Sequence, residues 1–141
     1  MKKLFYTVLV STVLFVSCKK DPVEVPCNID MGSIAGPYKL SVMKYKGASG
    51  GAETDITGTI SPCEVDDIVT FKANGTVTNT DAGTVCSPAG NTTATWSLSG
   101  KNLSFDGEQY TIESFDCKTL VLSQPDFIMT GDKVTVFYTK Q

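Results

Sequence analysis

Apolar and polar residues alternate along most of the chain after residue 34, and this alternation most constrains the fold. Successive side chains of a β-strand point to opposite faces, so a period of two marks a strand with one buried face. The alternating runs are residues 38–42, 69–71, 94–98, 102–105, 110–112, 120–122 and 134–138, and residues 76–80 bring the total to about eight strands. Short strands at this spacing are typical of an all-β sandwich or barrel.

Turn signals between these runs favour the barrel. Asn74-Gly75 lies between two strand patterns, and Asn-Gly is the strongest short hairpin signal. Gly100 and Gly107 mark turns of similar length. Short hairpins make consecutive strands antiparallel neighbours, and closing such a meander removes its exposed edges. We therefore expect an eight-stranded antiparallel up-and-down barrel with two longer loops, at residues 47–52 and 80–92.

The N-terminal residues have the layout of an export signal. Lys2 and Lys3 precede an apolar stretch at residues 4–16, and Ser17 then precedes Cys18. A transmembrane helix needs about 20 apolar residues, so an uncleaved anchor helix is the less favoured alternative. The arrangement resembles the signal peptide and lipobox of bacterial lipoproteins. It implies that residues 1–17 are removed and that the acylated Cys18 attaches the mature N-terminus to a lipid bilayer.

Beyond this leader, the composition indicates a tether and one domain. Residues 18–33 contain two prolines, mixed charges and no apolar period, as in a flexible linker. Residues 34–141 are long enough for one domain and too short for two. Ten lysines face fifteen acidic residues after residue 17, a balance of −5, and the chain has no Arg or His. Nucleic-acid-binding proteins usually carry a cationic surface, so we expect no nucleic acid partner.

Four cysteines remain once Cys18 is assigned to lipid: Cys27, Cys63, Cys86 and Cys117. An even number in an exported chain favours two disulfides, for which three connectivities are possible. A metal site would need closer cysteine spacing or nearby histidines, and the sequence has neither. We therefore expect disulfides and no metal.

Few residues are available for catalysis. His, the usual base near neutral pH, is absent, as is Arg, which clamps anions. Glu64, Asp66 and Asp67 form a carboxylate cluster before a strand, which could be a calcium site or an acid–base pair. The spacing of a calcium loop is missing, however, and neighbouring acids in such a place are usually solvated turn residues. We expect neither an enzyme nor a bound cofactor.

Several short motifs occur in a characteristic order: Gly36-Pro37-Tyr38-Lys39-Leu40, residues 63–75 with Phe71 before Asn74-Gly75, Trp96-Ser97-Leu98 followed by Gly100 and Leu103, and residues 110–112, 120–122 and 136–138. In this order they resemble the small lipocalin-like lipoproteins of Gram-negative bacteria of the Bacteroidota type, over about residues 34–140. Members of that family usually have tryptophan at the position of Tyr38, where it plugs the barrel floor. A tyrosine can do the same if its hydroxyl finds a partner.

The resemblance implies a barrel interior, a disulfide pattern and a location. The interior residues would be Tyr38, Leu40, Phe71, Trp96, Phe105, Tyr110 and Tyr138. Cys63 would pair with Cys86, and Cys27 with Cys117. The protein would belong to the cell envelope as an outer-membrane lipoprotein, on the periplasmic face or at the cell surface.

Two functions are compatible with such a barrel. The first is a non-catalytic binding module for a small apolar ligand. The alternative is a surface or periplasmic protein-interaction or assembly component with a filled barrel, and the number of bulky interior residues favours filling. A face containing Val121 and residues 127–129 is the candidate contact for a protein partner, although residues 127–129 could equally cap the barrel.

Overall fold

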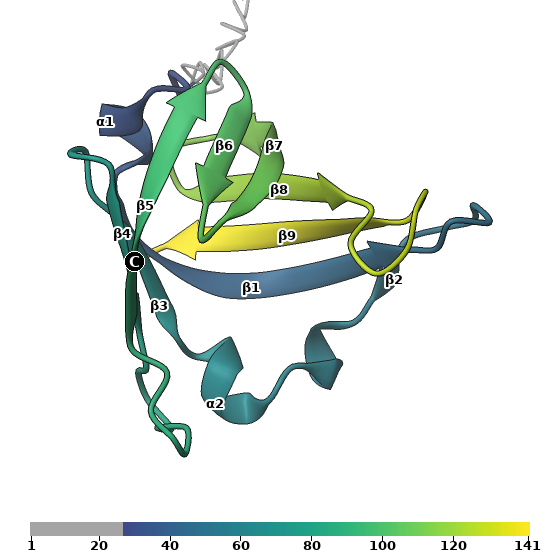
Figure 1. Cartoon of the computed structure of the whole chain (residues 1–141), viewed down its shortest axis with the longest axis horizontal. Helices are drawn as coiled ribbons and strands as arrows, with labels where there is room; N and C mark the ends of the chain where they lie inside the picture. The colour runs from purple at the N-terminus through teal and green to yellow at the C-terminus, as the bar shows by residue number, and fades with distance from the viewer. Residues whose placement is uncertain (1–26) are drawn as a thin grey trace, which may run out of the picture.

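Figure 1 shows the computed structural model of the chain, which describes residues 27–141. The expected signal peptide at residues 1–17, the proposed lipid-modified Cys18 and the tether as far as residue 26 lie outside the described residues. Between Cys27 and Gln141, no helix is long and apolar enough to cross a membrane.

The described residues form nine strands and three short helical segments. The helical segments are α1 (Met31–Ile34), the 3₁₀ turn η1 (Thr57–Thr59) and α2 (Pro62–Val65). The strands are β1 (Gly36–Lys46), β2 (Thr54–Asp55), β3 (Ile68–Phe71), β4 (Thr76–Thr80), β5 (Thr92–Ser99), β6 (Asn102–Phe105), β7 (Glu108–Phe115), β8 (Thr119–Pro125) and β9 (Lys133–Lys140). The sequence did not predict the helical segments, because a single turn is too short to show a helical period. It also did not predict β2, which has only two residues.

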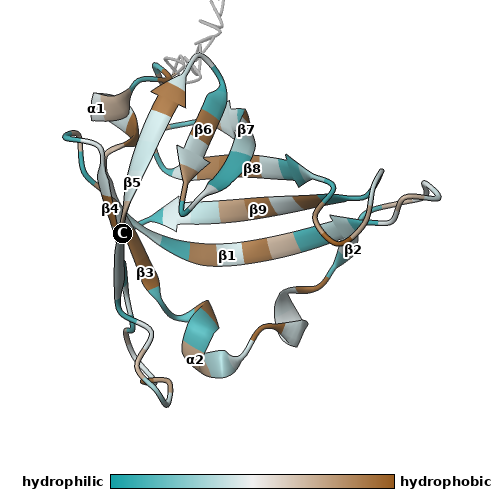
Figure 2. Cartoon of the chain, in the orientation of Figure 1, coloured by the Kyte–Doolittle hydropathy of each residue, from teal (hydrophilic) through white to brown (hydrophobic). Residues whose placement is uncertain are grey.

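Eight of these strands form a closed antiparallel ring. Hydrogen bonding runs in order from β1 through β3, β4, β5, β6, β7 and β8 to β9, and β9 pairs back with β1. The short strand β2 adds to the far end of β1. The predicted eight-stranded up-and-down barrel is therefore confirmed, and Figure 2 shows hydrophobic and hydrophilic bands alternating along its longer strands.

The two ends of the barrel differ. At one end, where β1 begins and β9 finishes, α1 lies against the barrel (Figure 1). We call this the closed end. The opposite end, called the mouth, carries α2, the β4–β5 loop, the β6–β7 turn and the β8–β9 loop.

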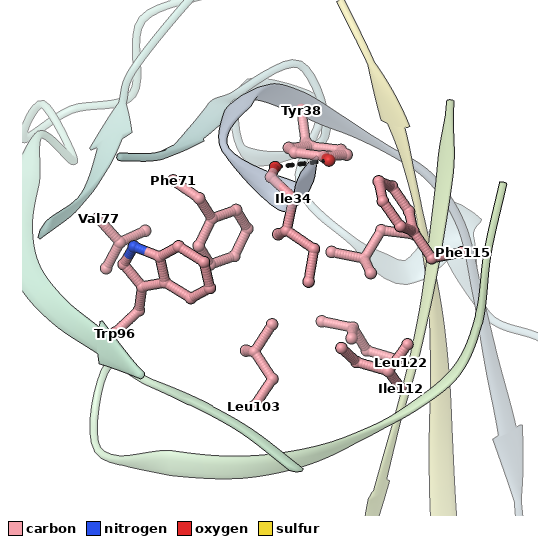
Figure 3. Packing of buried hydrophobic residues seen from close by; sticks show 10 residues of the cluster. Ile34, Tyr38, Phe71, Val77, Trp96, Leu103, Ile112, Phe115 and Leu122 are labelled. Atoms are coloured by element: carbon pink, nitrogen blue, oxygen red, sulfur yellow. Dashed lines mark hydrogen bonds between the residues drawn. The ribbon is translucent and has the colours of Figure 1, made fainter. Parts of the chain in front are cut away.

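Tyr38 plugs the closed end. Its side chain is fully buried, and its hydroxyl donates a hydrogen bond of 2.7 Å to the carbonyl oxygen of Ile34 (Figure 3). Burial raises the pKa of Tyr38 to about 12, because the charged phenolate would lose its hydration. Gly36, two residues before Tyr38, has a φ of 144°, and a Cβ there would overlap the side chain of Lys140. Tyrosine thus fits this position because α1 supplies an acceptor for its hydroxyl.

An aromatic cluster fills the closed half. The Phe71 ring makes edge-to-face contacts with Tyr38, Trp96 and Phe105, at centroid distances of 5.9, 5.0 and 5.3 Å. The Trp96 indole donates to the carbonyl oxygen of Lys72 over 2.7 Å, so its polar atom is satisfied. Aliphatic and aromatic side chains from the other elements complete this core: Ile34, Val77, Leu103, Ile112, Phe115, Leu120 and Leu122 (Figure 3).

The folded unit begins before residue 34. Cys27 is joined to Cys117 in the β7–β8 turn, with their Cα atoms 5.4 Å apart, and Ile29 and Met31 pack against the core. Asp30 caps α1 by accepting a hydrogen bond of 2.8 Å from the backbone N–H of Ser33. The expected tether at residues 18–33 is therefore too long at its C-terminal end, because isolated apolar residues between polar ones show no recognisable period in the sequence.

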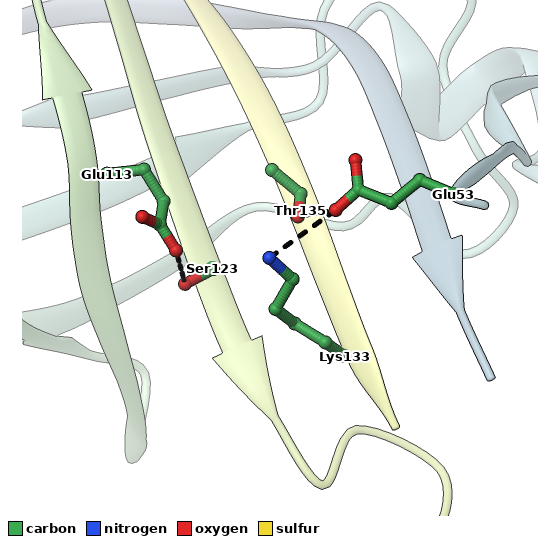
Figure 4. A network of polar contacts seen from close by, with 5 residues as sticks. All are labelled: Glu53, Glu113, Ser123, Lys133 and Thr135. Carbon is green, nitrogen blue, oxygen red and sulfur yellow. Dashed lines mark hydrogen bonds and ion pairs between the residues drawn. The ribbon is translucent and has the colours of Figure 1, made fainter. Parts of the chain in front are cut away.

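Polar side chains cover part of the outer face of β7, β8 and β9. The Ser123 hydroxyl donates to Glu113 over 2.6 Å, and the Thr135 hydroxyl donates to Glu53 over 3.1 Å (Figure 4). Lys133 forms an ion pair with Glu53 at 3.4 Å. Ser123 and Thr135 are almost fully buried on this outer face, because the longer side chains lie over them.

Candidate functional site

A cavity of about 480 Å³ occupies the mouth half of the barrel. Its inner surface combines apolar side chains with polar ones. The apolar residues are Leu40, Val69, Val77, Ala94, Phe105 and Tyr138, and the polar residues are Glu64, Asp67, Asn79, Thr92 and Asp106. Pro88 and Cys86 add to one wall from the β4–β5 loop. Small-molecule sites usually have volumes of about 300–1,000 Å³ and a mostly apolar lining. The cavity is therefore of a suitable size for a small ligand, and its lining is more polar than that of most such sites.

On β3 and β5, inward side chains become smaller toward the mouth. Every second residue of a strand faces the same side, so the inward series can be followed along each strand. On β5 the series is Trp96, Ala94 and Thr92, and on β3 it is Phe71 and Val69. The small side chains of these two strands leave space in the mouth half, and the rings of Phe105 and Tyr138 form part of the cavity wall.

Two carboxylates directly after α2 hold the β4–β5 loop. Asp66 accepts a hydrogen bond of 2.8 Å from the backbone N–H of Thr84, and Asp67 accepts one of 3.3 Å from that of Ala82. Gly83 has a φ of 60°, and a Cβ there would overlap the Asp66 carboxylate. The loop can therefore approach α2 this closely only because residue 83 is glycine.

The far part of the loop is fixed by a carboxylate and a disulfide. Asp81 accepts hydrogen bonds from the backbone N–H groups of Cys86, at 3.1 Å, and Gly90, at 2.7 Å. Cys86 is joined to Cys63 of α2, with Cα atoms 5.2 Å apart. The loop is thus a fixed wall of the cavity. Both disulfides have the pairing that the family resemblance implies.

Comparison with known protein families decides what kind of barrel this is. The Lipocalin-like domain profile matches residues 34–122, which is more than half of the chain. The chain belongs to the lipocalin-like domain family. Proteins with this domain are typically non-catalytic binding modules. No match was found among curated proteins.

The lipocalin-like barrel divides the seven predicted interior residues between its two halves. Tyr38, Phe71 and Trp96 belong to the closed core, Leu40, Phe105 and Tyr138 line the cavity, and Tyr110 stacks on Phe105 with ring centroids 4.8 Å apart. Burial raises the pKa of the Tyr110 and Tyr138 hydroxyls. The expectation of a filled core is therefore correct for the closed half and wrong for the mouth half.

The carboxylates noticed in the sequence have separate roles. Asp66 and Asp67 hold the β4–β5 loop, so they are not simply solvated turn residues. Glu64 is exposed and lines the cavity. Among residues 27–141, no group of three or more Cys, Asp or Glu side chains is arranged to hold a metal ion.

The lipocalin-like barrel exposes the apolar tip of its β8–β9 loop. Phe127, Ile128 and Met129 are 39%, 66% and 55% exposed, so they do not cap the barrel. The Asp132 carboxylate accepts hydrogen bonds from all three backbone N–H groups, at 2.6, 3.0 and 3.0 Å, and from the Tyr45 hydroxyl at 2.9 Å. A buried carboxylate thus fixes the loop with its side chains outward.

Val121 does not join that apolar tip. It is only 9% exposed and lies on β8, where its backbone partner on β9 is Phe137. The Lys44 ammonium lies over the Phe137 ring at 5.0 Å. The predicted face of Val121 and residues 127–129 is therefore reduced to residues 127–129.

Several cavity residues were not identified from the sequence. Asn79, Thr92 and Asp106 line the cavity from β4, β5 and the β6–β7 turn. Thr92 faces the cavity two positions before Ala94, so the same alternation could have identified it. Asp106 has a φ of 54°, a turn conformation that carries no sign of a ligand site.

Proposed function

We propose that this protein is a membrane-anchored lipoprotein of the cell envelope, whose lipocalin-like barrel binds a small apolar ligand. The cavity in the mouth half carries the proposal, because it offers apolar side chains such as Val69, Ala94 and Phe105 within a volume of about 480 Å³. The rigid wall formed by the β4–β5 loop supports it further, because a preformed site loses little conformational freedom when a ligand binds.

The position of the N-terminal segment supports a particular orientation. The Cys27–Cys117 disulfide fixes the start of the described chain at the closed end, opposite the cavity. Only eight residues lie between Cys18 and Cys27, and the nine steps from one cysteine to the other span at most about 30 Å. A lipid on Cys18 would therefore keep the closed end near the bilayer and leave the mouth accessible.

A cavity-filling substitution tests ligand binding. Ala94→Phe places a ring in the hollow half, so we expect at least a tenfold loss of affinity for the uncharged apolar fluorophore N-phenylnaphthylamine, corresponding to about 1.4 kcal/mol. The free energy of unfolding should change by less than about 1 kcal/mol, because the cavity has room for the ring. Binding is measured by fluorescence titration of the full chain in nanodiscs, with empty nanodiscs as the reference.

Thr95→Phe is the matched control, because Thr95 is the next residue on β5 and is exposed. It adds a similar ring on the outer face and should leave the affinity within about twofold of the wild type. Unchanged affinity in Ala94→Phe would contradict ligand binding in the cavity.

Membrane attachment is tested separately through Cys18. We expect Cys18→Ala to move the protein from the membrane fraction to the soluble fraction of cells, because a lipidated cysteine is the proposed anchor. Lys20→Ala is the control and should remain in the membrane fraction. A Cys18→Ala protein that stays membrane-bound would contradict the lipoprotein assignment.

A second candidate function is protein interaction through residues 127–129. The observation that favours it is the Asp132 carboxylate, which holds three exposed apolar residues in one conformation. The sequence-based prediction paired protein interaction with a filled barrel. Contact through residues 127–129 does not require the barrel interior to be filled. Co-purification of one protein at a fixed stoichiometry, lost in Ile128→Asp, would support this function.

A further inference from the structure

The polar part of the cavity lining is rich in hydrogen-bond acceptors and negative charge. Glu64 and Asp67 lie on one side, at α2 and the start of β3, and Asp106 lies in the β6–β7 turn. All three are acidic, and no lysine among residues 27–141 lines the cavity. The cavity itself is the site, and these carboxylates determine which ligands it favours.

Asn79 lines the cavity beside Asp67. Its amide nitrogen donates a hydrogen bond of 3.1 Å to Asp67, and a carboxylate can only accept, so the orientation of the amide is fixed. The Asn79 Oδ1 is buried and has no hydrogen-bond partner within the described residues. The amide's donor is therefore used by the protein, and its acceptor is left without a donor.

Three lysines of β1 and β9 make contacts away from the cavity. Lys44 lies over Phe137, Lys133 pairs with Glu53 on the outer face, and Lys140 donates to the carbonyl oxygen of Ser33 at the closed end. A ligand at the mouth therefore meets carboxylates without a compensating cation from these side chains.

We propose that the ligand has an apolar body and a cationic, hydrogen-bond-donating head, such as an alkylamine. The apolar body lies against Ala94, Val69 and Phe105, and the ammonium faces Glu64, Asp67 and Asp106. Partial burial strengthens the attraction between the ammonium and the carboxylates relative to open water. A fatty-acid carboxylate would be repelled by the same groups. This inference rests on the proposed ligand-binding function and specifies its ligand class.

Three ligands with the same alkyl chain test the proposal. Octylamine, octanol and octanoate are titrated at pH 7 against the full chain in nanodiscs of zwitterionic lipid, displacing N-phenylnaphthylamine. We expect octylamine to bind at least tenfold more tightly than octanoate, with octanol between them. Raising the salt concentration should reduce the difference, because the charges lie near solvent.

Two neutralising substitutions test the residues. In Glu64→Gln/Asp106→Asn, the preference for octylamine over octanoate should fall to about twofold, while the affinity for octanol stays unchanged. Asn tolerates the left-handed backbone of residue 106, so the turn should persist. The control is Asp30→Asn/Glu113→Gln, which changes the net charge equally but lies outside the cavity lining. This control should retain the wild-type preference.

The outcomes separate this inference from the function on which it rests. Octanol binding without a preference for octylamine would overturn the cationic ligand class and leave ligand binding intact. An unchanged preference in Glu64→Gln/Asp106→Asn would also overturn the inference. If none of the three ligands displaced the fluorophore, the inference would fail, whereas the ligand-binding function would fail only if Ala94→Phe also bound the fluorophore as tightly as the wild type.

Discussion

Phe71→Ala is expected to lower the free energy of unfolding by about 3–5 kcal/mol, which is the usual cost of truncating a buried aromatic residue. Phe71 is 1% exposed and has edge-to-face contacts with three other rings. Each such contact contributes about 0.5–1.5 kcal/mol beyond the burial of apolar area, which favours the upper part of the range. Small domains have a total stability of about 5–15 kcal/mol, so the variant should be close to unfolding.

Urea unfolding followed by far-ultraviolet circular dichroism measures this loss. Phe71→Leu retains part of the buried volume and should have an intermediate stability. Phe127→Ala is the matched control, because the same truncation at the exposed β8–β9 loop should change stability by less than about 0.5 kcal/mol. A loss below about 1.5 kcal/mol for Phe71→Ala would mean that the closed half is not the stabilising core.

The strands were predictable because their pattern is local. Tyr38 and Leu40 on β1, like Trp96 and Leu98 on β5, alternate with polar residues, and half-buried strands require this alternation. The turn at Asn74-Gly75 was equally local, because Gly75 adopts a φ of 85° that few other residues accept. Closure of the ring followed from the short connections.

The cavity could not be predicted in the same way. Its volume depends on which inward residues of different strands lie at the same height, and this requires the register of the whole ring. Phe71 pairs with Val77 and Gly36, whereas Val69 pairs with Asn79 and Tyr38. A count of bulky residues favours a filled barrel because it ignores the small side chains at the mouth end of β3 and β5.

The loops also depended on contacts distant in sequence. Residues 127–129 have an apolar composition that favours burial, yet the Asp132 carboxylate and the Tyr45 hydroxyl, 87 residues away in the chain, fix them outward. Similarly, the position of the β4–β5 loop depends on Asp66, which is 18 residues from its partner Thr84. No short-range sequence pattern indicates these hydrogen bonds.

Removing the Cys27–Cys117 disulfide should have the other large effect. Its sequence separation is 90 residues, compared with 23 for Cys63–Cys86. Cross-links reduce the conformational entropy of the unfolded chain more when they close longer loops, and the chain-entropy relation gives about 4.6 and about 3.4 kcal/mol. We therefore expect Cys27→Ala/Cys117→Ala to lose more unfolding free energy than Cys63→Ala/Cys86→Ala. Cys117 has a φ of 72°, but alanine has the same Cβ, so the backbone strain there is the same in both proteins.

Ligand affinity should rank the two double variants in the opposite order. Cys86 lines the cavity and fixes the β4–β5 loop, so Cys63→Ala/Cys86→Ala should bind N-phenylnaphthylamine several-fold more weakly. Cys27 and Cys117 lie at the closed end, and their replacement should leave the affinity of the folded protein within about twofold of the wild type. Urea unfolding and fluorescence titration of both variants provide the two rankings. Equal losses in both measurements would show that neither disulfide acts locally, whereas opposite rankings would assign overall stability to one and the shape of the mouth to the other.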